Sequence, residues 1–96
     1  MNILALIALK IIRQQESVIG PLAWSEASKV FGLTINTHTE AGIVITDGDD
    51  KSVVDRLVKQ YEQLFGNTAR EVCRQAVGAL IADLKPDQIP TSLKSA

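Results

Sequence analysis

His38 is the only histidine in this chain of 96 residues, and it lies near a polar loop beside a short β-branched run. An imidazole can act as a general base or as a metal ligand because it titrates near neutral pH. A closed zinc site would also need carboxylates and Cys73, since there is no second histidine. We interpret His38 as a surface residue, and a base or ligand role is the alternative.

The acidic turn Asp47-Gly48-Asp49-Asp50 is the second group that could bind a ligand. Carboxylates and loop carbonyls are the oxygen ligands that hard cations prefer. The turn lacks the spacing of a calcium loop, in which acidic residues alternate and a glutamate follows at a distance. We therefore expect a turn and a helix cap, and Asp47, Asp49 and Asp50 remain alternative metal ligands.

Cys73 is the only cysteine, so the chain cannot form an internal disulfide. That composition fits a reducing compartment such as the cytoplasm. The residue lies on an apolar helical stripe, which predicts a buried structural thiol, with a redox or metal role as the alternative.

Nothing in the sequence places a serine or threonine nucleophile beside His38, as nucleophilic catalysis would require. The chain also has no glycine-rich phosphate loop and no dinucleotide fingerprint. We therefore predict no cofactor and favour a protein without catalytic activity.

The elements that position these residues are clearest between Asp49 and Leu84, which predict two helices joined at Phe65-Gly66-Asn67. Apolar residues recur at helical spacing on both helices. On the first they are Val54, Leu57, Val58, Tyr61, Leu64 and Phe65; on the second they are Ala69, Val72, Cys73, Ala76, Val77, Leu80 and Ile81. Gly66 suits a left-handed helix end, and Thr68 and Glu71 have capping-box spacing. Because the link is short, the helices must pack together.

Residues 3–15 predict a further helix, with a buried strand as the alternative, and nine of residues 3–12 are apolar. This run is too short to span a bilayer and lacks the features of a secretion signal, so we expect a cytoplasmic protein without a membrane span. A helix that is apolar on so much of its circumference needs cover on several faces. Either the other helices wrap it or a second chain covers it.

Gln15 to Gly20 read as a link, and Pro21 opens a short helix that runs from Leu22 to Phe31. Its expected inner face consists of Leu22, Ala23, Ala27, Val30 and Phe31. Trp24 lies at the edge of the core or acts as an exposed anchor. Residues 33–46 then alternate with period two and predict a hairpin that must lie on the helices or pair with another chain.

These elements predict an α+β fold, predominantly helical, in the order helix–helix–strand–strand–helix–helix. Residues 1–86 form the predicted compact domain. Residues 87–96 are polar, contain Pro90, and are expected to form a frayed tail.

The order of residues 3–46 (helix, turn, helix ending at Phe31-Gly32-Leu33, hairpin) resembles part of a winged helix. The resemblance implies nucleic-acid binding through the second helix, which carries Glu26 and Lys29 but no arginine. The formal net charge of the chain is −1, and neither half has the basic excess that nucleic acids favour. We therefore keep nucleic-acid binding as an alternative.

The leading hypothesis is a non-catalytic regulatory or protein-interaction module that works as a homodimer or on a protein partner. It rests on apolar side chains beyond what one small domain needs, and the predicted interface residues are Ile3, Leu6 and Trp24. A small-ligand or metal sensor remains a further alternative. It would use the space between the helices and the hairpin, with His38 or the acidic turn.

Overall fold

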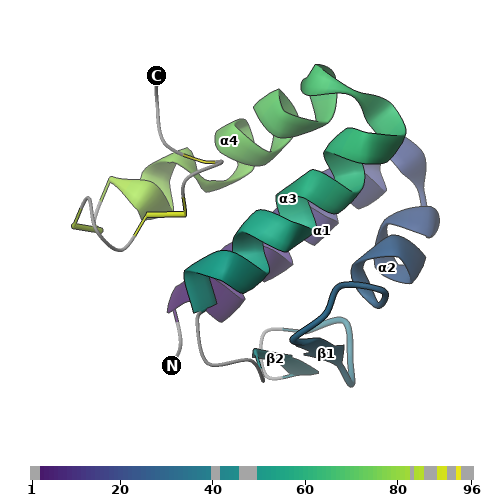
Figure 1. Cartoon of the computed structure of the whole chain (residues 1–96), viewed down its shortest axis with the longest axis horizontal. Coiled ribbons are helices and arrows are strands. Elements are labelled where there is room, and N and C mark those ends of the chain that lie inside the picture. The colour runs from purple at the N-terminus through teal and green to yellow at the C-terminus, as the bar shows by residue number, and fades with distance from the viewer. Residues whose placement is uncertain are drawn as a thin grey trace.

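The computed structural model describes residues 3–39, 42–45, 50–82, 84–85, 89–90 and 93. Its elements are α1 (Ile3–Ile19), α2 (Leu22–Ala27), β1 (Leu33–Ile35), β2 (Ile43–Ile45), α3 (Asp50–Phe65) and α4 (Asn67–Ile81). Figure 1 shows α3 lying along α1, with α4 at one side of this pair and the hairpin near the start of α3. The predicted mostly helical α+β fold and its element order are confirmed.

α1 lies at the centre of the fold and contacts α2, β2, α3 and α4. Its buried residues lie on more than one face: Leu4, Ala5, Ile7, Ala8, Leu9, Ile11, Ile12 and Gln15. The other elements of the same chain therefore cover the apolar run at residues 3–12. None of the described helices combines the length and apolar character that a membrane span requires.

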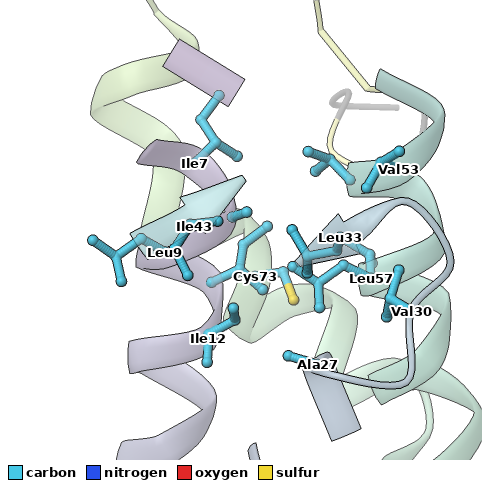
Figure 2. Packing of buried hydrophobic residues seen from close by; sticks show 14 of the residues in the cluster. Ile7, Leu9, Ile12, Ala27, Val30, Leu33, Ile43, Val53, Leu57 and Cys73 are labelled. Atoms are coloured by element: carbon cyan, nitrogen blue, oxygen red, sulfur yellow. The ribbon is translucent and has the colours of Figure 1, made fainter. Parts of the chain in front are cut away.

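Side chains from all six elements named above and the turn after α2 meet in one core. Figure 2 labels ten of them: Ile7, Leu9, Ile12, Ala27, Val30, Leu33, Ile43, Val53, Leu57 and Cys73. The two strands pair antiparallel, with Leu33 opposite Ile45 and Ile35 opposite Ile43. A two-stranded hairpin is marginal alone, so its contact with α1 is what stabilises it.

The N-terminal helix is longer than predicted, and the second helix is shorter. α1 continues through the predicted link to Ile19, whereas α2 ends at Ala27. Phe31 was placed on the inner face of a longer helix, but its side chain is 73% exposed. Turns at residues 28–32 break the helical spacing that would have carried this ring inward.

At the end of α3 the burial also differs from what the apolar periodicity predicts, because Leu64 and Phe65 are exposed. An apolar stripe can continue into a last helical turn that has no neighbour to pack against. The predicted capping box is wrong, since α4 begins at Asn67 after Gly66 and no side-chain cap bond forms. Gly66 has φ 77° and ψ −164°, a conformation that favours glycine but is not the predicted left-handed helical one.

The C-terminal segment was expected to lie outside the compact domain. Among its described residues, Pro90 and Leu93 are buried and Ile89 packs against the core. These few apolar side chains lie among polar residues of the segment, so its polar composition concealed them.

Candidate binding site at Trp24 and His38

Trp24 and His38 were singled out separately in the sequence, and the structure stacks them on each other. Their ring centroids lie 3.8 Å apart and the ring planes differ by 3°. Trp24 comes from α2, and His38 from the polar segment that follows β1. Fourteen positions of sequence separation and a turn hide this contact from any local pattern.

Hydrogen bonds from α1 hold both partners of the stack. The indole Nε1 of Trp24 donates to Oε2 of Glu16 at 2.8 Å. Nη2 of Arg13 donates to the backbone carbonyl oxygen of His38 at 3.2 Å. Trp24 is only 7% exposed, whereas His38 is exposed, so the tryptophan forms a fixed wall and the imidazole forms its rim. One face of α1 thus orients residues from two later segments.

An open pocket of about 580 Å³ lies beside this stack, between α1, α2 and the first strand. Its lining consists of Glu16, Pro21, Trp24, Ser25, Ser28, Ile35 and His38. Apolar surface from Trp24, Pro21 and Ile35 is therefore framed by hydroxyls, an imidazole and a carboxylate. A mainly apolar hollow with a few polar groups at its edge is the usual composition of a binding site.

The serines that line this pocket, Ser25 and Ser28, form no described hydrogen bond with the imidazole of His38. Oγ of Ser28 donates to the backbone carbonyl of Ser25 at 2.7 Å, so its proton is directed away from His38. The face of the imidazole is covered by Trp24, and no serine in the described part of the chain hydrogen-bonds to it. A nucleophile activated by a neighbouring base would need that bond.

Of the residues considered as alternative metal ligands, the structure describes the side chains of His38 and Cys73, and these two have different surroundings. His38 stacks on Trp24, while Cys73 is buried in the core. Asp47 and Asp49 lie outside the described residues; Asp50 begins α3, and its side chain is also outside them. Within the described ranges, no three histidine, cysteine, aspartate or glutamate side chains are grouped closely enough to hold a metal ion.

Cys73 occupies the structural position that its helical stripe predicts. Burial raises the pKa of its thiol to about 11, which keeps it protonated and poorly nucleophilic at neutral pH. Its sulfur accepts a hydrogen bond from Nε2 of Gln15 at 3.4 Å. Sequence reasoning missed Gln15 because it assigned that residue to a link.

The predicted interface residues are largely occupied within the chain. Ile3 and Leu6 are partly buried and pack against the core, and Trp24 is itself part of the core. Trp24 also borders the open pocket described above.

Comparison with known proteins found no matching family model, no matching curated protein and no matching solved structure. The case for function therefore rests on the geometry of the chain itself.

Proposed function

We propose that the chain is a non-catalytic protein-interaction module that forms a homodimer through the Trp24–His38 pocket. The observation that supports this is an apolar pocket whose tryptophan wall is already fixed by Glu16. A preorganised side chain loses little conformational entropy when a partner binds. Tryptophan surrounded by a polar rim is also typical of the residues that dominate interface energy.

Exposed apolar residues lie next to the pocket residues in the sequence, and this favours a second copy of the chain as the partner. Leu22 directly follows Pro21 of the pocket and is 46% exposed, and Val18 at the end of α1 is 61% exposed. A twofold dimer uses the same patch on both subunits. The pocket residues and the exposed apolar side chains lie close together in the sequence. In a twofold dimer the apolar side chains of each copy can therefore bind the pocket of the other.

The homodimer can be tested by sedimentation velocity across a concentration series, combined with fluorescence of Trp24, the only tryptophan. We expect a concentration-dependent dimer and a shift in tryptophan emission as it forms. Ser25→Tyr should fill the pocket and weaken the dimer. Ser17→Tyr is the matched control, because Ser17 is also an exposed helical serine but does not line the pocket. A monomer at every concentration, or equal effects of both variants, would contradict the proposal.

A small-molecule sensor is the second candidate, and the size of the pocket favours it. About 580 Å³ falls within the range of pockets that hold small ligands. Native mass spectrometry of freshly purified protein distinguishes the two functions: a bound organic mass lost in Ser25→Tyr supports the sensor, and a dimer without added mass supports the interaction module.

Nucleic-acid binding through α2 has less geometric support. The helix spans six residues, and four of them, Ala23, Trp24, Glu26 and Ala27, are buried. Little of its surface is left to enter a major groove, where a longer exposed helix normally reads the bases.

A further inference from the structure

A second hollow shares no lining residue with the Trp24–His38 pocket. We call it the basic cleft. It has a volume of about 270 Å³ and is formed by α3 and the turn after α2. Lys29, Arg56 and Lys59 bring three cationic groups to it, and Gln60 and Gln63 add two amides. No acidic residue is among the described residues that line it.

An aromatic ring stands at the edge of the basic cleft. Phe31 lines the cleft and remains 73% exposed, which is unusual for one of the few aromatic side chains in a small domain. The guanidinium carbon of Arg56 lies 5.3 Å from the ring centroid, and Nη1 of Arg56 donates to the Phe31 carbonyl oxygen at 3.1 Å. These contacts hold the ring beside the cations.

Glu26 is not a lining residue, but it holds two side chains that are, Lys29 and Gln60. Its carboxylate accepts hydrogen bonds from Nζ of Lys29 and from Nε2 of Gln60, each at 2.9 Å. The bond from Lys29, followed by that from Gln60, holds the pKa of Glu26 below its ordinary value, so this carboxylate is ionised at neutral pH. This carboxylate pairs with Lys29, and Arg56 and Lys59 bring two further cationic side chains to the lining.

We propose that the basic cleft binds a mononucleotide-type ligand, in which a phosphate is attached to a flat heteroaromatic ring. Lysine and arginine are the side chains that bind phosphate, and an exposed phenylalanine provides a face on which a base can stack. The small cleft suits one nucleotide. A nucleic-acid strand would need a longer basic track, and the chain as a whole carries a formal net charge of −1.

The site can be tested by titrating ¹⁵N-labelled protein with adenosine 5′-monophosphate at low salt and following backbone amide shifts by NMR. We expect shifts at residues 29–31 and 56–63, and an affinity that falls as salt is added, because the contacts are ionic. Lys59→Gln should raise the Kd about fivefold or more, since it removes a charged phosphate contact. Lys10→Gln removes an exposed lysine from α1, outside the cleft, and should leave the Kd unchanged.

The two halves of the ligand are tested separately with inorganic phosphate and adenosine. Phe31→Leu keeps an apolar side chain but removes the ring, so it should weaken adenosine monophosphate about fivefold or more and leave phosphate binding unchanged. If phosphate binds as tightly as the nucleotide, the ring has no role and the proposal is wrong. Absence of shifts, shifts confined to the Trp24–His38 pocket, or equal effects of the two lysine variants would also overturn it.

Discussion

The side-chain amide of Gln15 on α1 donates a hydrogen bond to the backbone carbonyl of Ala69 on α4, across 3.1 Å within the core. Gln15 is 1% exposed, so this polar side chain is shielded from solvent. A buried amide is tolerated only where it finds hydrogen-bond partners, and here both the carbonyl and the sulfur of Cys73 accept from it. The bond therefore fixes the position of the start of α4 along α1.

Gln15→Ala should destabilise the fold through two effects that act together. It removes the hydrogen bond to Ala69 and leaves a cavity between α1 and α4, and we expect a loss of about 2–3 kcal/mol in the free energy of unfolding. Urea denaturation measures this change. Gln14→Ala is the control, because Gln14 is exposed and its truncation should stay within about 0.5 kcal/mol. Equal effects of the two substitutions would show that the buried amide has no special role.

The position of Gln15 illustrates what the sequence could not predict. The helical spacing of Val54, Leu57 and Tyr61 was sufficient to predict α3, and their burial follows that pattern. A glutamine carries no such signal, since it is polar and common on helix surfaces. Gln15 is buried only because α4 packs against α1, and that packing depends on the whole chain.

Cys73 and Tyr61 should make the protein less stable as the pH rises. Burial raises the pKa of the Cys73 thiol from an ordinary value of 9.0 to about 11, and it raises the pKa of Tyr61 as well. Between pH 9 and 11 the unfolded chain releases the thiol proton while the folded chain retains it, so stability is lost over that range. The urea midpoint should therefore fall from pH 9 to pH 11.

Cys73→Ala separates the two contributions. The variant should show a smaller decline between pH 9 and 11, and the remaining slope should come from Tyr61, whose hydroxyl donates to the Ala23 carbonyl at 2.6 Å. Below pH 8 the wild-type midpoint should be flat with respect to these two groups. An identical slope in wild type and variant would show that Cys73 does not titrate with unfolding.

Gly78 and Gly66 should respond in opposite directions to substitution by alanine. Gly78 lies within α4, and a Cβ added there would meet no atom within 4 Å, so Gly78→Ala should stabilise the protein by about 0.5–1 kcal/mol. Gly66 also has space, but its φ of 77° strains an L-residue, and Gly66→Ala should cost about 1–3 kcal/mol. Thermal unfolding compares them, and a rise in Tm for Gly66→Ala would contradict the assigned backbone conformation.

The Trp24–His38 pocket was harder to predict than the helices around it. The sequence offered Trp24 as a core or anchor residue and His38 as a loop residue, and each description holds in part. Their contact requires the turn at Gly20 to reverse the chain after α1 and the end of β1 to return towards α2. Periodicity describes which face of an element is buried, but it does not report which distant loop passes over that face.

Glu16 should control how firmly Trp24 is held in the pocket wall. Glu16→Ala leaves the indole N–H without its 2.8 Å partner, and we expect a loss of about 1 kcal/mol in unfolding free energy together with faster hydrogen exchange at Nε1. Glu16→Gln is the matched control, because its amide oxygen can still accept the bond, and it should remain close to wild type. If a loosely held tryptophan is a poorer contact surface, Glu16→Ala should also weaken the proposed dimer while Glu16→Gln does not. Equal dimer affinity in the two variants, despite faster indole exchange in Glu16→Ala, would show that preorganisation of Trp24 contributes nothing to self-association.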